Sequence, residues 1–79
     1  MTESIKDKAL RFRNLAKDET FQELIETVAH RQVDVFLAQE SSTEAIDEAR
    51  AIVVALKEID TVIQSILDAE AVYDKKHNS

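Results

Sequence analysis

The chain of 79 residues contains no cysteine, no glycine, no proline and no tryptophan. Without cysteine no disulfide can form, and with only two histidines we expect no structural zinc site. Hairpin turns between strands usually need Gly or Asn, and turns in general favour Gly and Pro. The absence of both residues therefore predicts an all-α protein.

Long apolar runs are also missing. No run approaches the roughly 20 residues that a membrane-spanning helix needs, and the first residues lack the apolar region of a secretory signal. We therefore expect no membrane contact and a cytoplasmic location.

Catalytic patterns are absent too. No serine stands beside a histidine in a nucleophile motif, and there is no cysteine nucleophile. Glu26, His30 and Asp34 follow one another at intervals of four residues, a row that would suit a divalent metal or a proton relay. The row lies away from the apolar stripe of its helix and matches neither HExxH nor ExxH, so we interpret it as a solvated face. We predict no enzyme activity, no catalytic residue, no metal site and no cofactor.

Charge divides the chain unevenly. Residues 1–17 carry five basic against two acidic side chains (net +3), and residues 18–74 carry 14 acidic against three basic ones (net −11). Lys75 and Lys76 add +2, which gives the net charge of −6. We expect a single helical domain over residues 1–79. It comprises a basic amphipathic N-terminal helix within 1–17 and an acidic helical hairpin over 18–76.

Apolar spacing predicts a short helix at about 3–16 and a longer helix at about 20–40. Phe12 and Phe21 are nine residues apart, which turns the side chain by about 180° on a straight helix. A break is therefore expected near Lys17–Thr20, where either Thr20 or Asp18 supplies the N-cap of the longer helix. Gln32 and Gln39 lie near the middle of that helix's broad apolar stripe and predict a polar layer or a wetter end of its interface.

A third helix is expected at about 43–75, capped by Ser41 or Ser42. The loop before it has only two or three residues by these bounds, which predicts an antiparallel helical hairpin that assembles into an oligomeric helical bundle. Its apolar residues alternate at spacings of four and three residues, as in a seam that faces another helix. We predict a self-association or packing seam of Ala49, Ile52, Leu56, Ile59, Ile63, Ile66, Leu67 and Tyr73.

This third helix outruns its predecessor by about 18 Å at 1.5 Å per residue. The overhang still carries Ile66, Leu67 and Tyr73. We expect this apolar surface to be covered by the N-terminal helix, by a second copy of the chain, or by a different protein. Tyr73 is either an interface anchor or a core residue near a fraying end.

The basic segment is predicted to bind a partner surface through Ile5, Lys8, Arg11, Phe12 and Arg13. We favour pairing of its cations, within the chain or between copies, with Asp68, Glu70 and Asp74. Such exposed pairs contribute about 0–1 kcal/mol each and fix register more than stability. Binding to another protein and binding to nucleic acid phosphates are the alternatives.

One stretch, from Phe21 to Ile66, resembles small helical-hairpin proteins encoded among bacteriophage head and DNA-packaging genes. The shared pattern consists of Phe21, Leu24, Arg31, Ser42-Thr43-Glu44, Glu48, Arg50 and the run Ala55-Leu56-Lys57-Glu58-Ile59. The resemblance implies a role in the virion or its assembly and no catalysis. If a phage encodes the chain, we expect it in the host cell cytoplasm, in the virion, or in both.

The leading hypothesis is a non-enzymatic, self-associating protein of phage structure or assembly, with protein partners as a homo-oligomer or within a larger assembly. One alternative is a small phage-encoded inhibitor that binds a host or defence protein through its acidic face. The other is a nucleic-acid accessory protein that uses the basic segment.

Overall fold

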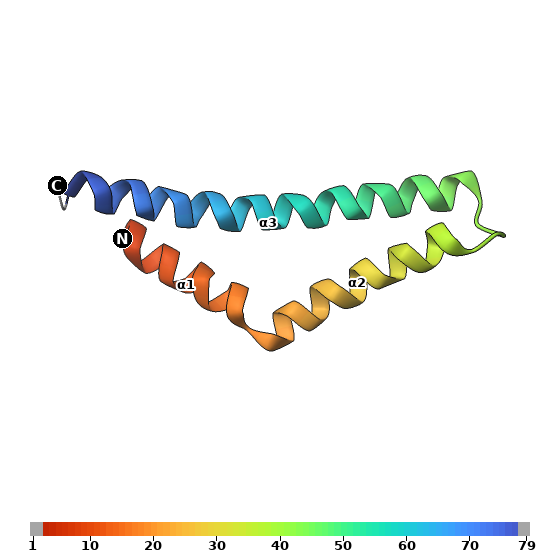
Figure 1. Ribbon diagram of the computed structural model, residues 1–79, viewed down its shortest axis with the longest axis horizontal. Coiled ribbons are helices and arrows are strands. Elements are labelled where there is room, and N and C mark those ends of the chain that lie inside the picture. The colour runs from red at the N-terminus through yellow and green to blue at the C-terminus, as the bar shows by residue number, and fades with distance from the viewer. Residues whose placement is uncertain (1–2, 78–79) are drawn as a thin grey trace.

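Three α-helices and no strand make up the part of the chain, residues 3–77, that the computed structural model describes (Figure 1). They are α1 (Ile5–Lys17), α2 (Glu19–Leu37) and α3 (Thr43–His77). The predicted all-α class is confirmed. The two ends of the predicted 1–79 domain, residues 1–2 and 78–79, lie outside the described residues.

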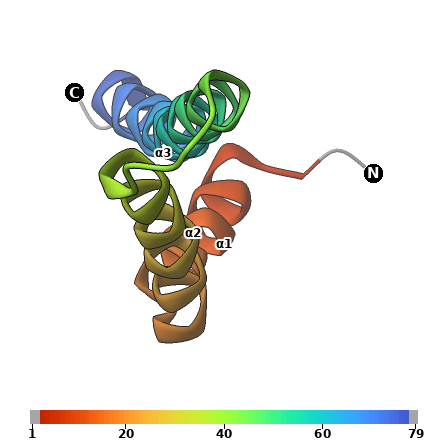
Figure 2. The ribbon, with the colours of Figure 1, turned by 90° about the vertical axis from the view of Figure 1, so that its right-hand side faces the viewer.

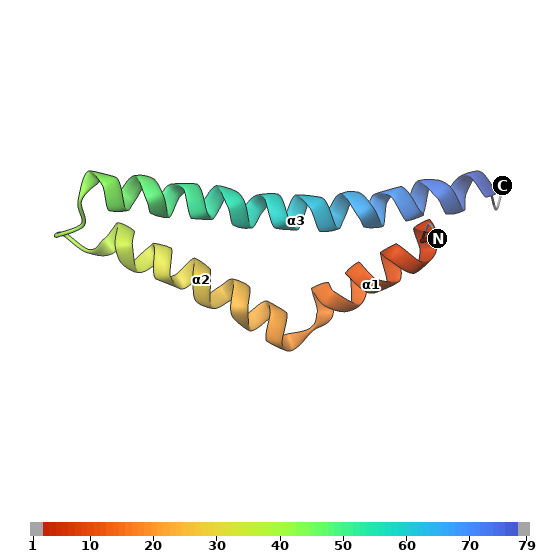
Figure 3. The same ribbon diagram turned by 180° about the vertical axis from the view of Figure 1, so that it is seen from behind.

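The helices form a bent arm against a straight rod. Helices α1 and α2 meet at an elbow, and both lie along the same side of α3, which runs the full length of the molecule (Figure 1, and from behind Figure 3). The end-on view shows α1 and α2 below α3 with no helix on its far side (Figure 2). Each of the three helix pairs makes contact. The result is elongated, with extents of 57 × 25 × 22 Å.

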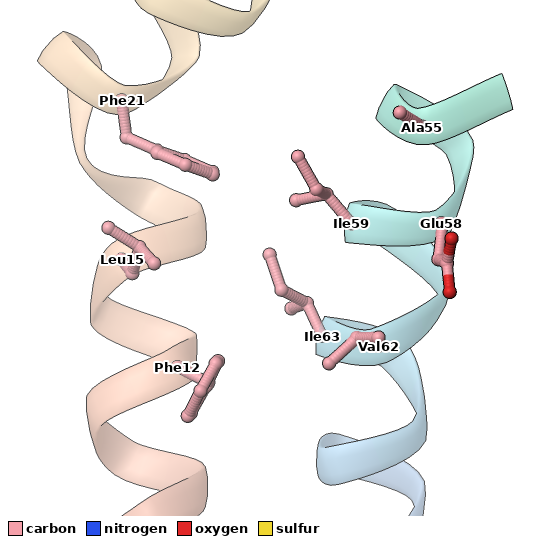
Figure 4. A pocket seen from close by; sticks show the side chains of 8 residues that line it. All are labelled: Phe12, Leu15, Phe21, Ala55, Glu58, Ile59, Val62 and Ile63. Carbon is pink, nitrogen blue, oxygen red and sulfur yellow. The ribbon is translucent and has the colours of Figure 1, made fainter. Parts of the chain in front are cut away.

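Asp18 makes the elbow. Its backbone is extended (φ −69°, ψ 124°), which ends α1, and its side-chain oxygen accepts a hydrogen bond of 2.8 Å from the Phe21 amide, which caps α2. Of the two predicted caps, Asp18 is therefore the one used. Gln22 ties the joint together, because its Nε2 donates to the Ala16 carbonyl at 2.9 Å. The break resolves the 180° mismatch, since Phe12 and Phe21 both point toward α3 (Figure 4).

The connection between α2 and α3 is longer than expected. Helix α2 ends at Leu37 rather than near residue 40, and residues 38–42 form the connection in place of two or three residues. Ala38 takes an extended backbone, and the Ser41 hydroxyl donates to the Val35 carbonyl at 2.7 Å, which satisfies an acceptor that a longer helix would have used. Ser42 then caps α3 by accepting from the Ala45 amide at 3.1 Å.

The buried core is thin. Ala9, Ala49 and Ile63 are the buried apolar side chains of the described residues, and Gln32 is the buried polar one. The Gln32 amide donates to the Val28 carbonyl at 2.8 Å, so its polarity is satisfied within α2. Gln39 is instead exposed in the connection. No large side chain in the described chain is fully enclosed, so α1, α2 and α3 alone do not build a conventional core.

Candidate interaction surface

An open apolar groove lies at the elbow, where α1 and α2 diverge from α3. Its volume is about 450 Å³. Figure 4 shows side chains from the two arms pointing across it toward α3. We call it the elbow groove; it is lined by Phe12, Leu15, Phe21, Ala55, Glu58, Ile59, Val62 and Ile63. Glu58 is its one charged lining residue, so this groove suits an apolar protein surface.

Two further openings along the same helices are more polar. One is bordered by Lys57, Asp60 and Thr61 of α3, and the other by Gln22 and Glu26 of α2 and again by Asp60. Charged and hydroxyl side chains on this side keep favourable contacts with water. The elbow groove is therefore the side on which a protein partner would gain most from excluding water.

The residues of the predicted seam on α3 differ in how deeply they are buried. Ala49 and Ile63 are buried, while Ile52, Leu56, Ile66, Leu67 and Tyr73 are half-buried. Ile59 is 42% exposed and lies in the elbow groove, where α1 and α2 diverge from α3 (Figure 1). Three candidates were expected to cover the apolar end of this helix. In the described chain, the N-terminal helix α1 lies against it.

Ion pairs join α1 to the end of α3. Lys6 Nζ lies 2.7 Å from Asp74 Oδ1, an oxygen that is itself enclosed, and the Arg13 guanidinium pairs with Glu70. Asp68, the third acid expected to meet a cation, instead accepts from the Gln64 amide at 3.0 Å. Two of the three predicted acids therefore meet the basic helix, within one chain.

The other predicted N-terminal residues are spread over two faces of α1. Ile5, Lys8 and Arg11 are exposed, whereas Phe12 and Arg13 are half-buried. Arg11 stays within its own segment: it pairs with Glu3 at 2.5 Å and lies 5.6 Å from the Phe12 ring centre. The five residues are therefore not a single patch.

These pairs shift the pKa of three groups. The hydrogen-bonding contact with Asp74, strengthened by its charge, raises the pKa of Lys6. The hydrogen bonds between Arg11 and Glu3 lower the pKa of the Glu3 carboxyl and raise the pKa of the Arg11 guanidinium. All three shifts favour the charged forms that make the pairs.

Tyr73 sits beside the last turn of α3. Its ring stacks on His77, with ring centres 4.0 Å apart, and His77 Nδ1 lies 2.9 Å from the Tyr73 carbonyl oxygen. The half-buried ring therefore packs along its own helix end as well as against neighbours.

The acidic row on α2 lies in solvent. Glu26, His30 and Asp34 are all exposed, and no group of three or more His, Cys, Asp or Glu side chains in residues 3–77 gathers closely enough for a metal ion. None of the helices in this described range combines the length and apolar character that crossing a membrane requires.

Four lining residues of the elbow groove were not predicted as interface residues: Leu15, Val62, and Ala55 and Glu58, which the sequence analysis named only within the run shared in the resemblance. Leu15 falls off the main stripe of α1, and the three others fall off the seam of α3. For the three residues on α3, the signal in the sequence is a second, weaker periodicity, which is easy to overlook because several of its residues are small.

No protein-family model, no curated protein and no solved structure matches this chain.

Proposed function

We propose that this chain is a non-enzymatic protein that self-associates through its helices and serves in the structure or assembly of a phage particle. The observation that carries self-association is the surface left open. The chain exposes 6531 Å², whereas a compact folded monomer of 8.9 kDa exposes about 4,800 Å². The excess of about 1,700 Å² on one chain is about twice the roughly 800 Å² that each partner buries in a standard protein–protein interface.

The dimensions support the same proposal. The radius of gyration is 17.2 Å, against about 12 Å for a compact domain of this length. Large apolar side chains stay exposed on every helix, among them Leu15, Leu37 and Val62. Association would bury part of this surface and supply the core that a single copy lacks.

The particle role rests on the resemblance over Phe21 to Ile66. Phe21 opens α2 and lines the elbow groove, so the first residue of the shared pattern lies beside the open surface. A small elongated subunit with exposed apolar faces suits repeated packing in a shell or a connector.

Size-exclusion chromatography with light scattering tests self-association. We expect a mass of at least two chains at micromolar concentration, and a clean monomer would overturn this part. Mass spectrometry of purified virions of the encoding phage tests the particle role. Many copies per particle are expected, and absence from the particle would contradict that role while leaving self-association in place.

The nucleic-acid alternative has no specific support among the described residues. Lys6, Arg11 and Arg13 each already pair with a carboxylate. Retention on DNA or RNA at 50 mM salt, where phosphate binding is strong, would revive this alternative.

A further inference from the structure

Helix α3 has a second row of side chains that neither α1 nor α2 covers within residues 3–77. We name it the outer face of α3; each of its ten residues is exposed, and they are Glu44, Glu48, Ala51, Ala55, Glu58, Val62, Ser65, Ala69, Val72 and Lys76. They follow one another at spacings that alternate between four and three residues. This is the spacing of a helix–helix seam, and it is distinct from the seam that meets α1 and α2.

We propose, building on the proposed function, that a second copy of this chain docks on the outer face of α3. The two α3 helices would pack antiparallel about a two-fold axis beside residue 60. The geometric basis is that the row has the same spacing in both chain directions. In an antiparallel pair, residue 51 of one copy therefore lies opposite residue 69 of the other, 55 opposite 65, and 58 opposite 62. The centre of this match is residue 60, which is also the midpoint of α3 at Thr43–His77.

Side-chain size favours close approach of the two helices. Ala51 lies opposite Ala69 of the other copy, and Ala55 lies opposite its Ser65. Small residues at facing positions allow helix axes to come to about 8 Å, the lower end of the usual range. The outer face shares Ala55, Glu58 and Val62 with the elbow groove. A second α3 would therefore also cover part of that groove and the exposed Leu15 beside it.

Charge selects the antiparallel direction. The first turn of α3 carries Glu44 and its last turn carries Lys75, Lys76 and His77. Antiparallel helices bring the acidic start of one copy beside the basic end of the other, whereas parallel helices would set Glu44 against Glu44. Opposed helix dipoles favour the same arrangement.

Two spin-labelled variants test the arrangement. Because the chain has no cysteine, one introduced cysteine is the only site that a thiol-specific label can modify. In the dimer, labels on Val62→Cys lie four residues apart along the axis, about 6 Å, while labels on Val72→Cys lie 24 residues apart, about 36 Å. Pulsed electron resonance should thus give a short distance for the first variant and a long one for the second. Equal distances would indicate parallel helices and overturn the proposal.

The same samples separate this proposal from self-association itself. A monomer by light scattering, without dipolar coupling, overturns both. An oligomer by light scattering whose label distances lack the short–long pattern overturns docking on the outer face and leaves self-association standing.

Substitutions give an independent test. Val62→Glu places a carboxylate in the middle of the outer face and should weaken dimerisation by roughly tenfold or more, because the charge would have to be desolvated. Leu24→Glu is the matched control on α2, outside both the outer face and the elbow groove, and should leave dimerisation unchanged; both wild-type residues are about half exposed. Circular dichroism should show equal helicity for the two variants. Undiminished dimerisation of Val62→Glu would overturn the proposal.

Discussion

The ends of α3 and its middle are built differently. At one end α2 packs around Ala49, and at the other α1 packs around Ala9, and both alanines are buried. In the middle, α1 and α2 bend away from α3 at Asp18. Ile59 is 42% exposed there, although it belongs to the same heptad row as Ile63. The lesson is that a regular apolar row does not decide its own burial, because the path of the neighbouring helix does.

The two covered ends also differ from each other. The α1 end adds the Lys6–Asp74 and Arg13–Glu70 ion pairs to a buried alanine. The α2 end has no ion pair to α3 among residues 3–77 and relies on small side chains and the buried Gln32. Charge therefore helps to set the register of α1, whereas α2 is held by its short connection to α3.

The largest expected effect comes from one substitution made at two neighbouring positions. Ile63→Ala removes a buried side chain and should lower the free energy of unfolding by about 2–4 kcal/mol. Ile59→Ala, four residues away in the open middle, should lower it by about 1 kcal/mol or less, because the side chain is already partly in water. Urea unfolding at one fixed protein concentration measures both values. Equal losses would show that the middle is as closed as the ends.

Overpacking tests the covered end next. Ala49→Leu should lower the free energy of unfolding by about 1–3 kcal/mol, because the added atoms separate α2 from α3. Ala51→Leu, two residues along on the exposed side, is the control and should leave unfolding of the monomer nearly unchanged. Thermal unfolding of dilute samples distinguishes them. If both variants unfold at the same temperature, α2 does not pack closely against α3 at Ala49.

The elbow itself depends on Asp18. Asp18→Ala removes the side-chain acceptor of the Phe21 amide and should lower the free energy of unfolding by about 1 kcal/mol. Asp18→Asn keeps an acceptor oxygen and should stay close to the wild type. Amide hydrogen exchange at the start of α2 reports the change locally, and unaltered exchange in Asp18→Ala would mean that the cap does not hold the bend.

Glu58 is the single charge that lines the elbow groove, near the centre of the outer face. Glu58→Ala should strengthen association about two- to fivefold, since it removes two like charges from the middle of the proposed dimer. Glu40→Ala is the control because Glu40 lies in the α2–α3 connection, away from this surface. Analytical ultracentrifugation gives both constants, and weaker association of Glu58→Ala would run against the prediction.

The smallest effect is the pH response of the α1 end. The Glu3 pKa lies below its ordinary value of 4.5 because Arg11 donates hydrogen bonds to it. Its contribution is therefore fully present above pH 4.5 and is lost as pH falls through the folded-state pKa. The Lys6 pKa lies above 10.5, so its contribution is fully present below that pH and is lost as pH rises through the folded-state pKa.

Amide exchange of α1 against pH measures this response. Glu3→Gln should remove the acid-side change attributed to Glu3, and Lys6→Gln the alkaline-side one, while exchange in α2 follows the same course in all variants. An acid-side loss of equal size in Glu3→Gln would assign the response to another group.

Much of the local structure could be predicted from the sequence. The nine-residue interval between Phe12 and Phe21 required a break, and Asp18 supplies it with a cap. The end of α2 could not be placed, because Ala38, Gln39 and Glu40 all favour helix and neither Gly nor Pro marks a stop. The hydroxyl of Ser41, folded back onto Val35, is what accompanies the end of the helix.

The sequence by itself determined three amphipathic helices, two cap candidates each for the second and the third, and an acidic body with a basic first segment. These features depend on residue spacing and short-range hydrogen bonds, which a chain carries wherever it lies. Only the tertiary structure decided that α1 covers the end of α3 and that Asp74 and Glu70, rather than Asp68, meet its cations. It also decided that Ile59 and Val62 stay open at the elbow. Burial depends on the angle between helices, and that angle is set by contacts far apart in the chain.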